Sequence, residues 1–474
     1  MESIYDYAIF GGGVVGSAIF NKLCRLGKKC ILLELNDIAS GESKANSAIV
    51  HAGFDAKPGT FKARFNVLGS KMYKQMCERL GVLYKQIGAY VLGDNISIVN
   101  ELYSRGLKNG LLPDDMEVLN KEELNKRIGN LNDNITCGLF AKTSAITNPH
   151  LLTICLAEEG VVCGGTCKTF FKTEEIKQDN IFIIYGNNET IEAKNIINAS
   201  GFGYNDISTL LNCEKYDIKF RRGEYFVLDH SEKDLICATL FPLPSEKGKG
   251  VLVTPTVDGN VLVGPTAQES ENITKTTLEG LNDIKEKSSG LINNLNLKKT
   301  IRQFAGIRTC TGDDFIVEKS KMNDRVINIA GICSPGLSSA PAIAEYVVEL
   351  LGLENKEVVF NRIQPYFLAK DLPQDEYDKL VKIDYRYGKV ICKCEMITEG
   401  DIVFALHRPI KVKTVDGIKR RVRAGMGRCQ GGFCMDKVVK IIARENGISE
   451  FEVLKEYPNS EIFISEIKVW WKFW

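Results

Sequence analysis

Four cysteines near the C-terminal end of the sequence have the type and spacing of a metal or cluster site. One residue separates Cys392 from Cys394, and four residues separate Cys429 from Cys434. Between the two pairs lie 34 residues. Four thiolates in such a pattern can hold an iron–sulfur cluster or a metal ion. Zinc sites usually pair cysteines that lie two residues apart, so zinc is the less suitable occupant.

A glycine-rich turn near the N-terminus has the features of a dinucleotide-binding fingerprint. It follows a short apolar strand at residues 7–10 and opens a helix predicted over residues 15–26. A second strand, residues 30–35, ends near Glu34. In this context glycines permit the tight bend, the approach of the backbone to a pyrophosphate and close packing of helix on strand. These glycines are Gly11, Gly13 and Gly16.

The groups around this turn favour an adenine dinucleotide, and a second turn favours FAD over NAD. The free N–H groups of a helix N-terminus suit phosphates, and the carboxylate of Glu34 suits ribose hydroxyls but not a 2′-phosphate. Residues 195–201 form a strand that enters a turn of small residues. Residues 326–330 form another strand, followed by the glycine turn 331–336 and an apolar helix from about Ala340. Two glycine turns far apart in the chain suit a long cofactor.

Six stretches, taken in order, resemble the FAD-dependent D-amino-acid-oxidase-type family, in its glycerol-3-phosphate dehydrogenase branch. This resemblance implies an α/β fold similar to D-amino-acid oxidase and glutathione reductase, with a Rossmann-like FAD-binding domain and an antiparallel substrate sheet. An Asp-Gly turn at residues 256–260 indicates a hairpin in that sheet. The matching stretches are residues 11–34, 41–53, 222–226, 250–255, 304–308 and 334–341.

The resemblance also implies roles for individual residues. His51 is expected beside the flavin as the base for a substrate hydroxyl, because an imidazole can take a proton near neutral pH. Arg308 and, as a second cation, Lys249 are expected to hold an anionic substrate, and Arg222 and Tyr225 to begin a strand of the pocket wall. The expected cofactor contacts are Gly11, Gly13, Gly16, Glu34, Ser43, Asn46, Ser47, Gly201, Gly331, Gly336, Leu337 and Ser338.

The C-terminal segment around the four cysteines resembles the bacterioferritin-associated-ferredoxin-like [2Fe-2S] domain, with residues 423–434 as the best match. The resemblance implies a small helical domain in which Cys392, Cys394, Cys429 and Cys434 hold the cluster. Residues 389–445 contain 13 Lys or Arg and 6 Asp or Glu, and the run 419–423 contributes most of the excess. This charge either offsets the cluster or docks an acidic redox partner.

These features divide the chain into four predicted parts. Residues 1–360 form the oxidoreductase part, 361–388 a linker, 389–445 the [2Fe-2S] domain and 446–474 a tail. Within the first part, FAD contacts are expected from residues 1–80, 140–210 and 300–355, and the substrate sheet mainly from 211–300.

Composition narrows the class of protein further. The net charge of +1 over 474 residues does not favour nucleic acid as a partner. The absence of a long apolar segment or an export signal, together with 15 cysteines, predicts a cytoplasmic protein with reduced thiols. The tail contains Trp470, Trp471 and Trp474, which could contact a membrane interface, pack on a partner subunit or belong to a disordered end.

The leading hypothesis is a dehydrogenase that oxidises glycerol 3-phosphate to dihydroxyacetone phosphate. Electrons would pass from the flavin to the [2Fe-2S] cluster and then to a redox partner protein or a quinone. The alternatives are oxidation of 2-hydroxyglutarate or a similar 2-hydroxy acid, oxidation of an amine or amino acid, and a non-catalytic electron-transfer subunit.

Overall fold

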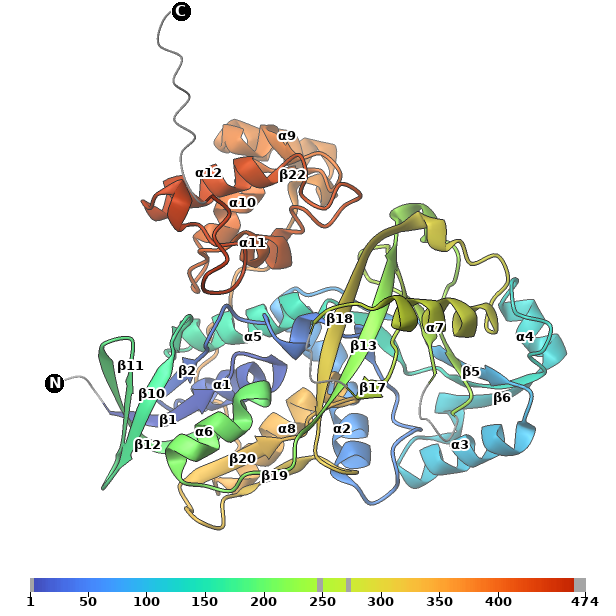
Figure 1. The fold of residues 1–474 in the computed structure, drawn as a ribbon, viewed down its shortest axis with the longest axis horizontal. Helices are drawn as coiled ribbons and strands as arrows, with labels where there is room; N and C mark the ends of the chain where they lie inside the picture. The colour runs from blue at the N-terminus through green and yellow to red at the C-terminus, as the bar shows by residue number, and fades with distance from the viewer. Residues whose placement is uncertain (1–3, 245–249, 270–273, 464–474) are drawn as a thin grey trace, which may run out of the picture. The chain divides into compact units, whose positions relative to one another are not determined.

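The computed structural model describes residues 4–244, 250–269 and 274–463. The chain divides into two compact units, residues 1–365 and residues 366–474, drawn from blue to orange and from orange to red in Figure 1. Within the described ranges, no helix combines the length and the apolar character needed to cross a membrane. The predicted substrate contact Lys249 and the tryptophans of the tail lie outside the described residues.

An eight-stranded, largely parallel sheet forms one half of the first unit. Its order is β10-β11-β12-β1-β2-β9, with β20 also paired to β12 and β19 to β20. The pairs β1–β2, β1–β12, β2–β9 and β12–β20 are parallel, and the other pairs are antiparallel. The strands are β1 (Tyr5–Phe10), β2 (Cys30–Leu33), β9 (Thr166–Lys168), β10 (Thr173–Gln178), β11 (Phe182–Gly186), β12 (Glu189–Asn198), β19 (Ile316–Lys319) and β20 (Val326–Ala330).

Four longer helices and one short helix accompany this sheet. Helix α1 (Val14–Arg25) packs against α5 (Pro149–Val162) and α8 (Gly336–Leu350), and α8 packs in turn against α2 (Phe61–Leu80). Helix α6 (Tyr204–Leu211) contacts β10 and β12. The predicted helix after the first glycine turn is confirmed to within one residue at each end. Helix α8 begins at Gly336, four residues before the start predicted near Ala340, because it follows the second glycine turn directly.

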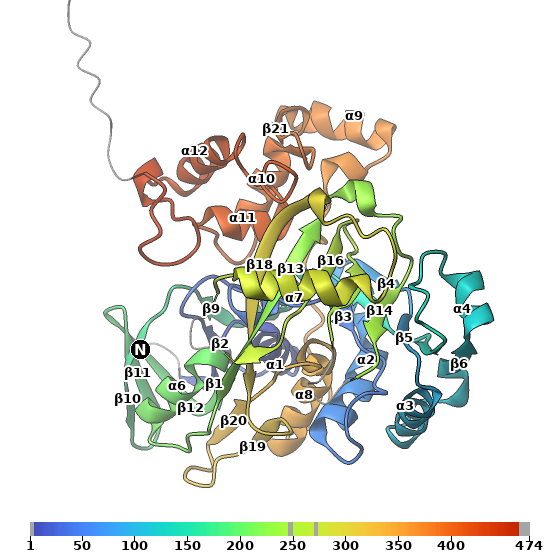
Figure 2. The same cartoon turned by 45° about the vertical axis from the view of Figure 1, so that its right-hand side comes forward.

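A nine-stranded mixed sheet forms the other half of the first unit. Its order is β17-β13-β16-β15-β14-β5-β7-β6, with β18 paired to β13. Figures 1 and 2 both show β13 and β18 as a long twisted ribbon. The strands are β5 (Ala89–Gly93), β6 (Met116–Asn120), β7 (Cys137–Ala141), β13 (Lys219–Leu228), β14 (Thr239–Pro242), β15 (Leu252–Pro255), β16 (Val261–Gly264), β17 (Gln268–Glu269) and β18 (Thr300–Cys310).

This sheet differs from the one expected mainly from residues 211–300. Strands β5, β6 and β7 come from much earlier in the chain, and β5 joins β14 through a parallel pairing. A small sheet of β3 (Ile49–Val50), β8 (Ala145–Thr147) and β4 (Tyr84–Gln86) lies in the same unit. The hairpin predicted at residues 256–260 is present between β15 and β16, where Gly259 has φ +91°.

Apolar faces of this second sheet pack under short helices. The buried side chains of β5, β13, β15 and β16 form one core with residues of α7 (Leu278–Ser289) and α4 (Lys121–Arg127). A neighbouring core joins strands β5 and β7 to α3 (Ile96–Lys108). Burial of apolar area at about 25 cal/mol per Å² is the main stabilising contribution of such cores. They fix the position of the long β13–β18 ribbon.

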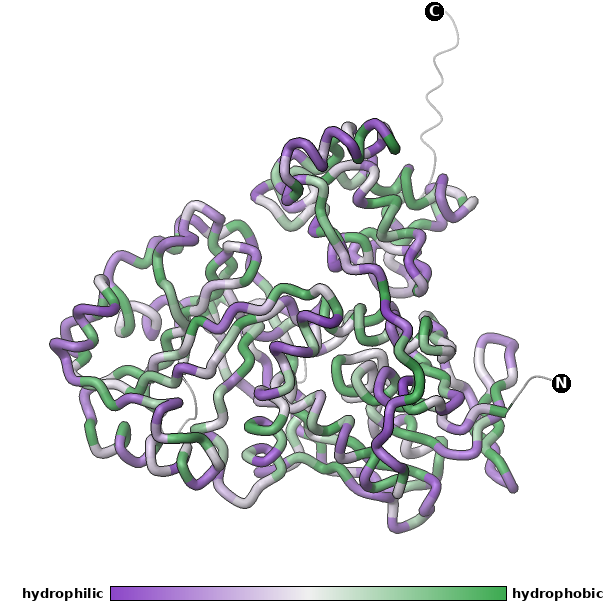
Figure 3. The backbone as a smooth tube through the Cα atoms, turned by 180° about the vertical axis from the view of Figure 1, so that it is seen from behind, coloured by the Kyte–Doolittle hydropathy of each residue, from purple (hydrophilic) through white to green (hydrophobic). Residues whose placement is uncertain are grey.

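The second unit is a small helical body around its own core. It contains α9 (Gln374–Ile383), α10 (Glu399–Leu406), α11 (Val415–Val422) and α12 (Met435–Asn446), with the short strands β21 (Val390–Cys392) and β22 (Ile397–Thr398). Hydrophobic and hydrophilic residues alternate along its helices in Figure 3, as expected for helices with one buried face. Helix α9 lies in the segment predicted as a linker. It contains no fully buried residue.

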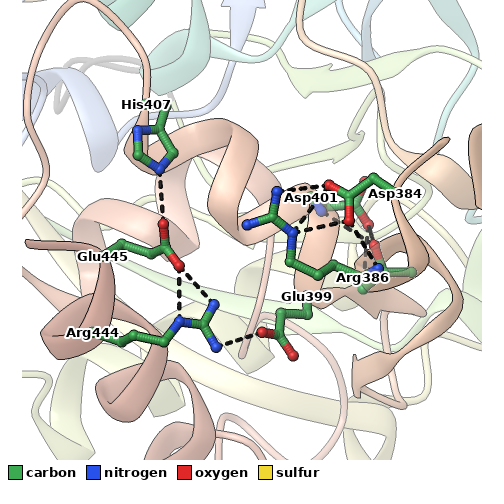
Figure 4. A network of polar contacts seen from close by, with 8 residues as sticks. Asp384, Arg386, Glu399, Asp401, His407, Arg444 and Glu445 are labelled. Atoms are coloured by element: carbon green, nitrogen blue, oxygen red, sulfur yellow. Dashed lines mark hydrogen bonds and ion pairs between the residues drawn. The ribbon is translucent and has the colours of Figure 1, made fainter.

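Polar side chains join the helices of the second unit (Figure 4). The ring of His407 lies 2.8 Å from a carboxylate oxygen of Glu445, and Arg444 donates a 2.7 Å hydrogen bond to Glu399. Asp401 accepts the backbone N–H groups of Thr398 and Ala369, which closes the start of α10. These contacts hold together the helices of the second unit, in which β21 and β22 are the only strands described.

Candidate active site and cluster site

One large cavity, of about 790 Å³, lies in the first unit. The N-terminus of α1, the loop after β2, the end of β12, the ribbon β13–β18 and the turn before α8 all contribute to its wall. It therefore receives residues from both halves of the unit. The predicted site residues that line it are Gly11, Gly13, Glu34, Ser43, Asn46, Ser47, His51, Gly201, Arg308, Gly331, Gly336 and Leu337.

The first glycine turn forms one end of the cavity. Gly11 has φ +104°, and a Cβ atom there would lie 2.4 Å from the carbonyl oxygen of Ala199. A Cβ on Gly16 would lie 2.0 Å from the oxygen of Gly11, so this glycine permits helix packing and does not line the cavity. Glu34 accepts the backbone N–H of Gly12 at 2.6 Å. The backbone and the carboxylate thus form the wall expected for a nucleotide.

The loop from residue 40 to residue 53 is held by its own side chains. Ser43 accepts the backbone N–H of Val14, the first residue of α1, at 2.8 Å. The side-chain amide of Asn46 donates to the backbone carbonyl oxygen of Ser43 at 2.9 Å, and its Oδ1 atom accepts the backbone N–H of Ala48 at 2.8 Å. The hydroxyl of Ser47 lies 3.0 Å from that of Tyr225. These predicted cofactor contacts also shape the loop that presents them.

The turn between β20 and α8 forms a second wall made of backbone. Gly331 has φ +67°, and a Cβ atom there would lie 1.9 Å from the hydroxyl of Thr311. Gly336 begins α8, so a second helix N-terminus opens into the same cavity. Ser338, predicted as a cofactor contact, is fully buried and does not line the cavity. Its hydroxyl instead accepts the backbone N–H of His51 at 2.8 Å.

His51, the predicted base, contributes to the wall of the same cavity. Its ring centroid lies 5.8 Å from that of Phe241, on β14. His51 follows β3 directly, and β3 pairs with β8. The histidine backbone is therefore fixed on one side by a small sheet and on the other by Ser338.

One face of the β13–β18 ladder forms the wall opposite the glycine turns. Directly paired residues of antiparallel strands present their side chains on the same face. On one face of the ladder, every second pair, Tyr225 with Phe304, Gly223 with Gly306, and Arg221 with Arg308, lies in sequence along the strands. The aromatic rings stack at 4.7 Å, and the Nη2 group of Arg308 donates to the oxygen of Thr266 at 2.7 Å.

The glycine pair in this ladder provides space for the groups around it. A Cβ on Gly306 would lie 2.0 Å from the carbonyl oxygen of Ala45, so the loop of residues 40–53 rests directly on β18. A Cβ on Gly223 would lie 2.8 Å from Pro265 and 3.3 Å from the Nη2 atom of Arg308. The absence of side chains at these two positions allows both the loop and the guanidinium group to lie flat on the ladder.

Sequence reasoning missed Arg221 and chose its neighbour. Arg222 is buried on the opposite face, where it forms a 3.0 Å ion pair with Glu224 and a 2.9 Å hydrogen bond with Gln268. The strand that Arg222 and Tyr225 were predicted to begin does line the cavity, through Arg221, Gly223 and Tyr225, but Arg222 itself does not. Residues 222 and 225 cannot share one face of a regular strand, so the alternation of β-strand side chains was the available signal.

Glu42 is a second cavity residue for which no role was predicted from the sequence. It lines the cavity, and the hydroxyl and N–H of Thr309 hydrogen-bond its carboxyl group. Among the residues that the structure describes, its Oε1 atom has no hydrogen-bond partner. Burial raises the pKa of Glu42 to about 7, although Thr309 acts in the opposite direction. Near neutral pH this carboxyl group can therefore be protonated.

The four predicted ligand cysteines come together in the second unit as two pairs. The thiols of Cys392 and Cys434 share a hydrogen bond, and so do those of Cys394 and Cys429. Within the described part of the chain, no group of three or more His, Cys, Asp or Glu side chains is arranged to hold a single metal ion. Two close pairs match the requirement of a [2Fe-2S] cluster, in which each iron takes two protein ligands.

Backbone groups surround these cysteines in the manner expected of an iron–sulfur site. Gly425 and Glu395 offer backbone hydrogen bonds to Cys392, and Phe433 and Gly431 offer them to Cys429. The hydrogen bond from Cys434 lowers the pKa of Cys392 to about 6. A Cβ on Gly427 would lie 2.5 Å from that of Cys394. The glycines therefore leave room for the thiols and free N–H groups that can reach sulfur.

The basic run that precedes this site is largely internal. Arg420, Arg421 and Arg423 are 4%, 3% and 8% exposed. Arg420 contacts Glu456, and Arg423 donates a 2.9 Å hydrogen bond to Glu395. These three side chains are therefore unsuited to the predicted docking of an acidic partner, because they already pack inside the unit.

Comparison with known families identifies the first unit. Residues 6–350 match the family model of FAD dependent oxidoreductases. The chain belongs to this family. Residues 390–444 of the oxidoreductase match the BFD-like [2Fe-2S] binding domain. The predictions of fold class and of both cofactors, FAD and a [2Fe-2S] cluster, are confirmed by these matches.

Individual relatives of the oxidoreductase extend the comparison. It is 42% identical to a glycerol 3-phosphate dehydrogenase of Caloramator mitchellensis, over 98% of this chain and 99% of that protein. A solved structure of L-alpha-glycerophosphate oxidase from Mycoplasma pneumoniae with FAD bound has a TM-score of 0.71 and 30% identity, covering 75% of this chain and 97% of its own. A glycerol-3-phosphate dehydrogenase from Bacillus halodurans, with 18% identity and a TM-score of 0.69, covers 95% of this chain and 92% of its own and shares the fold.

The cavity wall fits the cofactor of this family. FAD is long and carries two phosphates, and the cavity has two helix N-termini, α1 and α8, and four glycines with positive φ in its wall. Backbone N–H groups at such termini stabilise phosphate and other anionic groups.

Proposed function

We propose that this oxidoreductase is a dehydrogenase that converts glycerol 3-phosphate to dihydroxyacetone phosphate. The observation that carries the proposal is the placement of Arg221 and Arg308, directly opposite each other, in the wall of the cavity that His51 also lines. Two guanidinium groups suit a phosphate dianion, which can accept several charge-assisted hydrogen bonds. The relative in Caloramator mitchellensis, similar over nearly the whole chain, carries the name of the same activity.

Each residue of the proposed site has its own role in the reaction. Arg308 and Arg221 hold the phosphate, with Lys249 as a further contact, and so orient the secondary alcohol toward His51. The imidazole of His51 takes the proton from the substrate hydroxyl. Bound FAD supplies the acceptor for the hydride that leaves the same carbon, which becomes a carbonyl carbon. The hydrogen bond from the His51 backbone to Ser338 keeps the imidazole at the required position.

The cofactor would be held mainly by backbone. Gly11, Gly13 and the start of α1 would bind the pyrophosphate, and Glu34 the adenosine ribose. Ser43, Asn46, Ser47 and Gly201 would border the rest of the molecule, with Gly331, Gly336 and Leu337 on the other side. Gly16 and Ser338 would act indirectly, through helix packing and through His51.

We extend the proposal to the path of the electrons. Cys392, Cys394, Cys429 and Cys434 would hold the [2Fe-2S] cluster, which serves as the exit for electrons toward a redox partner protein or a quinone. A flavoenzyme that reacts directly with oxygen does not need such a site. This argues for a dehydrogenase over an oxidase.

The substrate assignment is tested by rapid mixing of the anaerobic, oxidised holoenzyme with candidate substrates. We expect glycerol 3-phosphate to bleach the flavin absorbance much faster than 2-hydroxyglutarate, an amino acid or a secondary amine. Bleaching by one of these compounds, with glycerol 3-phosphate inert, would assign the cavity to that substrate. Glycerol itself is the matched control, because it has the same alcohol and lacks the phosphate that the arginines would hold.

The His51→Ala variant separates an enzyme from a non-catalytic electron-transfer subunit. We expect flavin reduction by substrate to slow by about 10²-fold or more, the usual contribution of a general base. Flavin content and the absorbance of the cluster should stay at the level of the parent protein. Undiminished reduction by substrate would favour the non-catalytic alternative.

A further inference from the structure

Two thiols outside the cluster site meet in the wall of the active-site cavity. Cys310 is the last residue of β18, and Cys333 lies in the turn between β20 and α8. Both are half-buried, both line the cavity, and their thiols share a hydrogen bond. The proposed hydride transfer uses neither of them.

The backbone around the two thiols is tightly defined. Strands β19 and β20 pair as an antiparallel hairpin, with Ile316 opposite Ala330, so the chain leaving β18 and the chain entering the turn lie together. A Cβ on Gly331 would lie 3.0 Å from the backbone nitrogen of Thr311 and closer still to its hydroxyl. Only a glycine can occupy that position without moving the chain. The approach of Cys333 to Cys310 is therefore built into the fold.

The surroundings of the pair are electropositive. Lys62 and Arg308 act on Cys333 in the direction that favours its thiolate. The hydrogen bond with Cys333 and burial raise the pKa of Cys310, although Arg221 and Arg308 act in the opposite direction, so Cys310 is the protonated partner of the pair. The hydrogen bond from Cys310 is the largest influence on Cys333 and lowers the pKa of Cys333 to about 6. A partly exposed thiolate among cations is a reactive nucleophile, and a second thiol in contact with it can resolve a mixed disulfide.

We propose that Cys310 and Cys333 form a reversible dithiol–disulfide site that reacts with small-molecule disulfides entering the cavity. The Cys333 thiolate attacks one sulfur of the small disulfide, whose S–S bond breaks and releases one thiolate. Cys310 then attacks the sulfur of Cys333, and the second small thiolate leaves. The two cysteine protons end on the two released thiols, so the protein loses two electrons and the small disulfide gains them.

Closure of this disulfide would join the end of β18 to the turn before α8. Arg308 lies two residues before Cys310, so oxidation would restrain the strand that carries a proposed substrate contact. The redox state of the cavity wall would therefore be coupled to binding. The chemistry of the two thiols does not depend on which hydroxy substrate the enzyme uses.

The experiment uses the holoenzyme, prepared anaerobically and treated with bis(2-hydroxyethyl) disulfide. After acid quenching, free thiols are alkylated, the protein is digested without reductant, and the peptides are analysed by mass spectrometry. We expect a cross-linked peptide pair that contains Cys310 and Cys333, formed with the loss of two hydrogen atoms and removed by dithiothreitol. Recovery of both cysteines as alkylated thiols, or of Cys333 only as a stable mixed disulfide, would overturn the proposal.

Two variants test the order of the steps. In Cys310→Ser the mixed disulfide at Cys333 should accumulate, because the resolving thiol is absent. In Cys333→Ser the thiol of Cys310 should stay unmodified for the same exposure. Cys237 is the matched control, since it is exposed and lies outside the cavity. A cross-link between Cys237 and either cysteine, or equal modification of all three, would show unspecific oxidation and contradict the proposal.

Discussion

The backbone N–H of His51 donates a 2.8 Å hydrogen bond to the hydroxyl of Ser338, a side chain with no exposed surface. This bond joins the loop after β2 to α8, the helix that follows the second glycine turn. The two segments are 287 residues apart in sequence. The position of the proposed base therefore depends on a residue that does not line the cavity.

Replacement of Ser338 by alanine tests this dependence. The His51 N–H would lose its acceptor, which costs about 1–3 kcal/mol of stability for a buried donor. Displacement of the imidazole by up to 1 Å can lower kcat by as much as about 10²-fold. The thermal midpoint and the rate of flavin reduction measure the two effects. Ser339→Ala is the control, because the Ser339 hydroxyl bonds Pro335 at the start of the same helix. Equal loss of rate in both variants would contradict a positioning role.

Replacement of either cavity arginine tests the proposed phosphate site. Loss of a hydrogen-bonded cation costs about 1.5–3 kcal/mol, so Arg308→Ala and Arg221→Ala should each lower kcat/KM by roughly 10- to 100-fold. Arg308→Lys should recover little, because a single ammonium group does not reproduce a guanidinium fork. Lys285→Ala, exposed on α7, is the control. If Arg221→Ala matched the control in steady-state kinetics, the second phosphate contact would have to be sought elsewhere.

The carboxyl group of Glu42 predicts a pH dependence of stability. Burial raises its pKa to about 7 from an ordinary value of 4.5, so the folded protein binds this proton more tightly than the unfolded chain. The contribution is fully present below about pH 4.5 and is lost as the pH rises through about 7. From pH 5.5 to pH 8, the thermal midpoint should therefore fall more in the parent protein than in Glu42→Gln. Parallel curves for the two proteins would mean that Glu42 does not hold the proton in the folded state.

Removal of one cluster ligand tests the electron path. Cys429→Ser should lose iron and the cluster absorbance while FAD stays bound and substrate still reduces the flavin. Turnover with an external one-electron acceptor should then fall sharply, because the exit for electrons is missing. Iron analysis, absorbance spectra and acceptor assays provide the measurements, with Cys237→Ser as the control. Unchanged turnover in a cluster-free protein would show that the acceptor takes electrons directly from the flavin.

The parts of the site that follow local stereochemistry could be predicted from sequence. Helix α1, which follows the turn at Gly11, begins and ends within one residue of its predicted bounds. The glycines of this turn were predictable because a side chain at Gly11 or Gly16 would collide with the backbone. The hairpin at residues 256–260 was predicted on a similarly local signal, its Asp-Gly turn.

Features that depend on long-range pairing were missed. The parallel pairing of β5 with β14 joins segments about 150 residues apart, so no local pattern assigns residues 89–141 to the second sheet. Arg221 received no role, although it lies next to Arg222, because one position in a strand decides which face a side chain occupies. The contact between Cys310 and Cys333 arises only when the hairpin of β19 and β20 forms.

The buried arginines of α11 change how the charge of the second unit should be judged. Arg420 and Arg421 contribute to a formal sum but lie in the interior, as does Arg423 just after the helix. Their charges still add to the electrostatic potential outside the unit, but their guanidinium groups cannot form direct ion pairs with an incoming electron acceptor. These arginines should therefore affect the rate of association more than the contacts of the bound complex.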